Sequence, residues 1–187
     1  MADRDWSPAG PLSISQTLGP HRRGFLDPTW RTEPDGSIWR ALRTTEGTVS
    51  LRIKQQSDRI HGTAWGSGAT WALDSLPRML GADDDPHSFQ PQHRVLKDLV
   101  GKFSGLRVGA TGLLWDALLP AVIEQRVTSR EAHRGFANLV RAHGEPAPGP
   151  GSELGLWVPP ESSRIKSIPS WDWRRFPVDH QRAGVVI

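Results

Sequence analysis

The sequence predicts an α+β protein in which a small antiparallel sheet is accompanied by helices. Residues 48–54 alternate between apolar and polar side chains at the period of a strand, and apolar side chains recur at helical spacing from residue 68 onward. Thr128 and Glu131 have the spacing of a capping box, which marks the start of a helix. Strand and helix signals therefore occupy different parts of the chain.

Three consecutive strands are expected, over residues 37–45, 48–54 and 59–65. Gly47 gives the first connecting turn a residue that tolerates positive φ, and residues 56–58 form the second turn. One face of the middle strand carries Val49, Leu51 and Ile53, and one face of the third carries Ile60, Gly62 and Ala64. This pattern indicates an antiparallel meander with one covered face.

Helices are expected over residues 68–80, 93–102, 111–126 and 128–143, then over 161–168 and from residue 178. Pro120 should kink its helix or free the carbonyl of Asp116, and Gly144 should end its helix as a C′ glycine. Residues 145–160 are rich in Pro and Gly and are interpreted as a connector. Residues 1–24 are interpreted as a flexible tail with a short basic run.

The composition restricts the class of protein. Apolar residues make up 36% of 187, and no stretch reaches the roughly 18 apolar residues of a membrane span. The acidic start lacks the apolar region of a signal peptide, so we expect a cytoplasmic protein. The chain has no cysteine, which excludes disulfides, thiolate metal sites and cysteine nucleophiles.

The basic residues are strongly biased towards arginine. There are 23 basic and 20 acidic residues, and 19 of the basic ones are Arg. Arginine makes bidentate contacts with phosphate, which favours a nucleic-acid surface. A GC-rich genome produces the same bias, and composition alone favours that second explanation.

The sequence offers no catalytic constellation and no metal or cofactor site. Residues 81–87 hold three Asp and one His, but their spacing lacks the regular pattern of a calcium loop, and a polar loop or helix cap is the better interpretation. No phosphate-binding glycine loop, Gly-x-Ser-x-Gly turn or closely spaced histidine pair occurs.

An ordered set of segments resembles bacterial 3-methyladenine DNA glycosylase II and its relatives among the helix-hairpin-helix base-excision glycosylases. The set covers about residues 25–187 and consists of residues 27–30, 64–69, 105–109, 115–118, 123–128, 131–132, 139–146, 158–160, 168–171 and 181–183. The resemblance implies an N-terminal α+β domain over 25–103, followed by the first part of an all-helical glycosylase domain over 104–187. It implies a bacterial, nucleoid-associated protein that binds double-stranded DNA and removes alkylated purines such as 3-methyladenine.

The family's catalytic aspartate and its Leu-Pro-Gly-Ile-Gly hairpin have no match in this sequence, so no catalytic residue is assigned. We therefore expect a truncated helical domain that is inactive alone and binds DNA weakly. Such a domain should leave Leu113, Leu114, Leu118, Val185 and Ile187 short of partners. The alternatives are a non-catalytic DNA-binding or interaction module, or a decayed product.

The resemblance also implies a DNA-wedging loop formed by Gln125, Arg126 and Thr128, with Arg130 beside it. The residue after this glutamine fills the space left by the flipped base in the family, where it is typically leucine. Arg126 occupies that position here and could fill the gap by stacking and hydrogen bonding. The alternative is that Arg126 is simply an exposed loop residue.

Three tryptophans, Trp30, Trp65 and Trp71, offer aromatic surfaces for an electron-poor alkylated base. Large aromatic side chains more often pack in a core, and core positions in the sheet domain are the favoured interpretation.

Overall fold

The computed structural model describes residues 1–176 and 184, and the helix expected from residue 178 lies outside them. The larger sheet has the order β1-β5-β4-β3-β2 and is antiparallel throughout. Its strands are β1 (Ala2–Trp6), β2 (Trp30–Thr32), β3 (Ile38–Thr44), β4 (Gly47–Gln56) and β5 (Arg59–Trp65). A two-stranded sheet pairs β6 (Glu145–Pro146) with β7 (Trp157–Val158).

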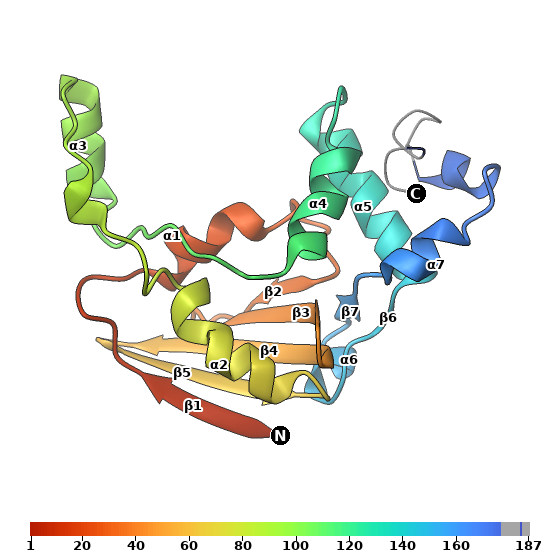
Figure 1. The fold of residues 1–187 in the computed structure, drawn as a ribbon, viewed down its shortest axis with the longest axis horizontal. Helices are drawn as coiled ribbons and strands as arrows, with labels where there is room; N and C mark the ends of the chain where they lie inside the picture. The colour runs from red at the N-terminus through yellow and green to blue at the C-terminus, as the bar shows by residue number, and fades with distance from the viewer. Residues whose placement is uncertain (177–183, 185–187) are drawn as a thin grey trace.

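Helices α4 and α5 lie beside the sheet in Figure 1, whereas α3 projects away from the other elements. The α-helices are α1 (Ile14–Leu18), α2 (Ala69–Met79), α3 (Arg94–Lys102), α4 (Leu114–Ile123), α5 (Ser129–His143), α6 (Pro150–Glu153) and α7 (Ser162–Lys166). Three short 3₁₀ helices among the described residues are η1 (Gly19–His21), η2 (Pro86–Ser88) and η3 (Asp172–Arg175). The α+β prediction is confirmed, while the proposed division after residue 103 stays a prediction.

The predicted three-stranded meander is confirmed as β3, β4 and β5. Gly47 adopts a φ of 123° at the first turn, which a glycine tolerates. Val49, Leu51 and Ile53 are all fully buried on one face of β4, as their alternation predicts. Helix α2 covers this face, and the methyl groups of Leu73 and Leu76 lie against Gly62.

The prediction of a flexible tail over residues 1–24 is wrong. Strand β1 pairs with β5 from Ala2–Ala64 to Trp6–Ile60, and α1 buries Ile14 and Leu18. The free edge of β5 explains the strand, because its unpaired backbone groups accept a partner whose own side chains are mostly polar. Pro8, Gly10 and Pro11 lie in the connection between β1 and α1.

The opposite face of the sheet is covered by the segment that was interpreted as a connector, residues 145–160. Trp39 and Ala41 of β3 pack there against Ala147, Leu156 and Val158, which flank or form β6 and β7. The backbone N–H of Trp157 also donates to the Pro28 carbonyl at 2.8 Å. This Pro- and Gly-rich stretch is therefore an ordered part of the fold.

A second core lies between α4, α5, α7 and η3. It contains Ile123 and Val122 from α4, Phe136 and Val140 from α5, and the buried Trp173 of η3. Helix α4 continues through Pro120, whose ring removes the N–H that would otherwise bond the Asp116 carbonyl. The short helix predicted over residues 161–168 is confirmed as α7.

Gly144 ends α5 for a reason other than the expected one. Its φ of −78° is open to any residue, so the left-handed C′ role is wrong. A side chain here would collide with the carbonyl oxygens of Val140 and Val158, so the close passage of β7 explains the glycine.

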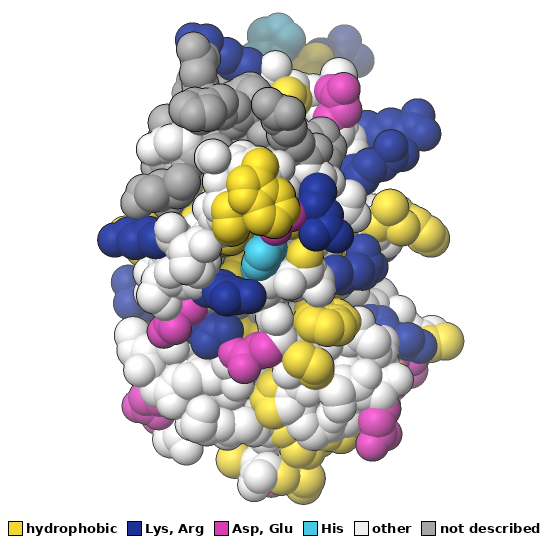
Figure 2. Space-filling model, turned by 90° about the vertical axis from the view of Figure 1, so that its right-hand side faces the viewer, with side chains coloured by type: hydrophobic (Ala, Val, Ile, Leu, Met, Phe, Trp, Pro, Cys, Tyr) yellow, Lys and Arg dark blue, Asp and Glu magenta, His cyan; other side chains and the backbone are white. Residues whose placement is uncertain are grey.

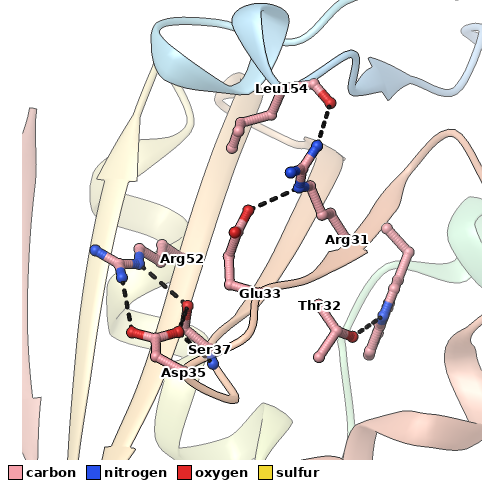
Figure 3. Close-up of polar contacts among 8 residues, drawn as sticks. Arg31, Thr32, Glu33, Asp35, Ser37, Arg52 and Leu154 are labelled. Atoms are coloured by element: carbon pink, nitrogen blue, oxygen red, sulfur yellow. Dashed lines mark hydrogen bonds and ion pairs between the residues drawn. The ribbon is translucent and has the colours of Figure 1, made fainter.

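Figure 3 shows the polar contacts that close the β2–β3 turn and tie it to the rest of the protein. Arg31 donates to Glu33 at 2.7 Å and to the Leu154 carbonyl at 3.4 Å. Asp35 accepts from the Ser37 hydroxyl at 2.7 Å and from Arg52 at 3.2 Å. The Ser37 hydrogen bonds, together with Lys54, hold the pKa of Asp35 well below its usual range.

The expectation of uncovered apolar side chains holds in part. Leu114 and Leu118 are exposed, whereas Leu113 is buried against the sheet core, so the expectation for Leu113 is wrong. Val185 and Ile187 lie outside the described residues. The apolar side chains of α3, including Val95 and Leu99, are also exposed, and the helix buries none of its own residues.

Candidate nucleic-acid interface

The predicted wedge loop is the connection between α4 and α5. The capping box at its end is formed as expected: Thr128 Oγ1 accepts from the Glu131 N–H at 3.3 Å, and Glu131 Oε2 accepts from the Thr128 N–H at 3.2 Å. Ile123 and Val127 pack into the helical core on either side of the loop tip. The two helices therefore hold both ends of this short loop.

Arg126 stands at the tip of the loop with a backbone φ of 58° and an exposed side chain. Ser57 is the other non-glycine residue with positive φ among those described. A non-glycine residue in this region costs about 1 kcal/mol, and such strain is concentrated at functional sites. The conformation turns the chain sharply between the buried Ile123 and the partly buried Val127.

The structure brings together the four predicted residues of this loop. Gln125, Arg126, Thr128 and Arg130 are all exposed, within one turn on either side of the start of α5. This arrangement leaves their side chains accessible to a ligand. Whether each contacts DNA stays a prediction.

Trp30 and Trp65 lie in the larger sheet and Trp71 lies in α2, all outside the α4–α5 loop. Trp30 is 8% exposed and its Nε1 donates to Thr32 at 3.0 Å. Trp65 stacks on Trp39 with ring centroids 5.2 Å apart, and Trp71, a residue of α2, is partly buried against the sheet core. These positions agree with the core interpretation, while base stacking by these side chains stays a prediction.

Sequence reasoning missed a second segment that adjoins the loop, residues 22–27. Arg23 lies 3.6 Å from Glu124, the first residue of the loop, and Arg141 of α5 donates to the Leu26 carbonyl at 3.2 Å. The signal was the basic run ahead of Phe25, which was interpreted as part of a tail. Only the fold shows that this run lies against α5.

A buried ion pair connects the sheet to α4 below this region. Arg40 of β3 donates to Asp116 at 2.9 Å, and the side chain of Arg40 is 3% exposed. Burial and then the charge of Arg40 lower the pKa of the neighbouring His21, which Arg23 also lowers and Asp116 raises. The pair thus lies among titratable groups from three parts of the chain.

The charge distribution over this side of the molecule is compatible with an anionic ligand. In Figure 2, Lys and Arg side chains outnumber Asp and Glu over the upper half of the face shown. Exposed arginines of α5 are Arg130, Arg134 and Arg141. Clustered arginines attract phosphate and bind it through paired N–H groups.

Two further findings concern other classes of site. Among residues 1–176 and 184, no three His, Asp or Glu side chains lie close enough to share a metal ion. No helix in the same residues is both long enough and apolar enough to cross a membrane.

The fold is shared with solved structures of DNA glycosylases. A 3-methyladenine DNA glycosylase from Archaeoglobus fulgidus superposes with a TM-score of 0.77 at 17% identity, over 98% of this chain and 64% of that one. MBOgg1 in complex with a low-affinity DNA ligand superposes with a TM-score of 0.72 at 15% identity, over 98% of this chain and 60% of that one. An 8-oxoguanine glycosylase/lyase from Clostridium acetobutylicum, bound to DNA, superposes with a TM-score of 0.68 at 11% identity, over 94% of this chain and 57% of that one.

No protein-family model matches the sequence, and no curated protein matches it. The chain spans between 57% and 64% of the length of the structures named above. At such low identity the similarity concerns the fold alone. The chain thus shares its fold with these solved structures of DNA glycosylases.

Proposed function

We propose that this protein recognises damaged DNA in base-excision repair, as part of a glycosylase that removes alkylated purines such as 3-methyladenine. The observation that carries the proposal is the exposed Arg126, held with positive φ at the tip of the α4–α5 loop. A side chain held in this way enters a base stack at a low entropic cost, because its backbone is already ordered. The ligand is double-stranded DNA that carries an alkylated base.

The residues of the loop have separate roles in this proposal. Arg126 enters the space vacated by the flipped nucleotide, where its planar guanidinium stacks and donates hydrogen bonds. Gln125, Thr128 and Arg130 contact the DNA on either side, with Arg130 paired to phosphate. Phosphate contacts supply most of the affinity, so binding should fall as salt is added. It should also be weak, because the family's phosphate-binding hairpin has no match in this sequence.

This chain is proposed to be inactive by itself, because no residue in it matches the family's catalytic aspartate. The second candidate is a DNA-binding module without catalysis, which the exposed arginines of α5 favour equally well. A measurement of base release distinguishes both of these candidates from an active enzyme. Tighter binding to damaged than to intact DNA distinguishes damage recognition from general DNA binding.

The test measures binding of the purified protein to duplexes with and without a methylated purine, by fluorescence anisotropy over a salt series. We expect weak binding that falls with salt, and tighter binding to the damaged duplex. Arg126→Ala should reduce that preference, whereas Arg59→Ala, at the exposed first position of β5, serves as the charge-matched control. Absence of binding at low salt refutes the proposal, and release of methylated base refutes the inactive state.

A further inference from the structure

Residues 22–27 present an aromatic side chain from a backbone that is held in place. Phe25 is 90% exposed, yet the residues around it are anchored. The N–H of Arg23 donates to Asp27 at 2.6 Å, and Gly24 lies directly against the imidazole of His133. An exposed aromatic ring on an ordered segment can stack on a flat ligand without further ordering of the backbone.

A groove of about 540 Å³ separates this segment from the first turns of α5. One wall is apolar and consists of Phe25 and Leu26, and the other consists of Arg130, His133 and Arg134. The guanidinium carbon of Arg22 lies 6.0 Å from the centre of the Phe25 ring, on the same segment. Among residues 1–176 and 184, no carboxylate lines the groove, so its chemistry fits a flat ring that carries a negative charge nearby.

The groove lies next to the α4–α5 loop rather than elsewhere on α5. Glu124, the first residue of that loop, is 3.6 Å from Arg23 Nη1 and 3.9 Å from His133 Nε2. Arg130 lines the groove and is also one of the residues expected to contact DNA beside Arg126. A strand that reaches the loop therefore passes the mouth of the groove.

We propose that this groove binds one unstacked nucleotide of the DNA strand held at the α4–α5 loop. The base stacks on Phe25, and its phosphate is bound by Arg130 and Arg134. The inference rests on the proposed function, because it requires that the chain binds DNA at this loop. Stacking on one aromatic ring changes affinity by roughly tenfold, and the effect depends little on which base is present.

The experiment compares an intact duplex with one that carries a single bulged 2-aminopurine, a base whose fluorescence falls when it stacks. Anisotropy gives the affinity for each duplex, and the 2-aminopurine signal reports stacking. Phe25→Ala should weaken binding to the bulged duplex by roughly tenfold and leave the intact duplex within about twofold. Phe25→Trp should retain both the affinity and the quenching.

Phe89→Ala is the matched control, because Phe89 is also an exposed phenylalanine, 55% exposed, outside the groove. Phe89→Ala should leave the affinity for both duplexes unchanged. The inference is overturned if Phe25→Ala binds both duplexes like the wild type, if it weakens both equally, or if Phe25→Trp behaves like alanine. In each of these cases the proposed function stands. If the wild type binds neither duplex at low salt, both the proposed function and this inference fail.

Discussion

Arg40 in β3 and Asp116 in α4, 76 residues apart, form an ion pair of 2.9 Å that links the sheet to the helices. Arg40 lies on the face of β3 that also carries Ile38 and Leu42, and its guanidinium carbon is 5.9 Å from the Trp30 ring centre. Its Nε and Nη1 have no hydrogen-bond partner among the described residues. Among the described residues, Asp116 is therefore the acidic partner on which the buried Arg40 depends.

Removing that carboxylate should destabilise the protein strongly. We expect Asp116→Ala to lower the free energy of unfolding by about 3 kcal/mol, because Arg40 would remain buried without its counter-charge. Urea denaturation measures this change. The control is Asp74→Ala, which removes the exposed 2.6 Å pair with Arg4 and should cost less than about 1 kcal/mol. Equal losses in the two variants would contradict a special role for the buried pair.

Acidification should weaken the fold through His21. Because the pKa of His21 in the folded protein lies below 6.5, the unfolded chain binds the proton at a higher pH. Unfolding is therefore favoured as pH falls through 6.5 towards the folded pKa, and the contribution is constant above that range. Comparing the unfolding free energies of wild type and His21→Asn between about pH 5 and 8 isolates the contribution of His21 to stability. A difference that does not vary with pH would refute this prediction.

The capping box at the start of α5 should contribute to stability. Thr128→Ala removes the acceptor for the Glu131 N–H, so it should lower the unfolding free energy by about 1 kcal/mol. Thr128→Ser keeps an oxygen in the same place and should retain most of the stability. Ser129→Ala, one residue further along the same exposed turn, is the control. Thermal denaturation of the three variants measures these changes in stability. If Ser129→Ala loses as much stability as Thr128→Ala, the contribution of the capping box is contradicted.

Gly144 should tolerate no side chain, although its φ is ordinary. Gly144→Ala places a methyl group against the carbonyl oxygens of Val140 and Val158, so we expect it to lower the free energy of unfolding by about 2 kcal/mol. Gly101 in the exposed helix α3 has open space around it, so Gly101→Ala should be neutral or stabilising by about 0.5 kcal/mol. If Gly144→Ala unfolds at the wild-type temperature, the close approach of β7 does not explain this glycine.

Arg126 should act on flipping more than on general DNA binding. In the proposed function its side chain occupies the gap in the stack, so Arg126→Ala should reduce the signal of a flipped fluorescent base by roughly tenfold. Binding to intact duplex should fall only about twofold, because the loss of one positive charge weakens the nonspecific electrostatic attraction only slightly. Stopped-flow fluorescence and anisotropy supply the two measurements. Equal losses in both would remove the wedge role and leave Arg126 as an ordinary phosphate contact.

Local patterns determined the elements that depend on neighbours in the chain. The alternation in residues 48–54 gave the correct buried face of β4, and the Thr128–Glu131 spacing gave the correct start of α5. Both signals come from interactions within a few residues, which sequence periodicity and capping chemistry record directly. The connection between α4 and α5 was predicted in the same way, whereas its wedging role came from the family resemblance and stays a prediction.

Only the tertiary structure decided the features that depend on distant partners. Strand β1 exists because β5 has a free edge, and Gly144 is required because β7 passes close to it. Likewise, Arg40 meets Asp116, and Phe25 faces α5, because the sheet and the helices pack together. None of these contacts has a local signature, since each depends on residues far away in the sequence. The arginines and the phenylalanine that we propose to bind DNA can be read from the sequence, but packing alone placed them beside one another.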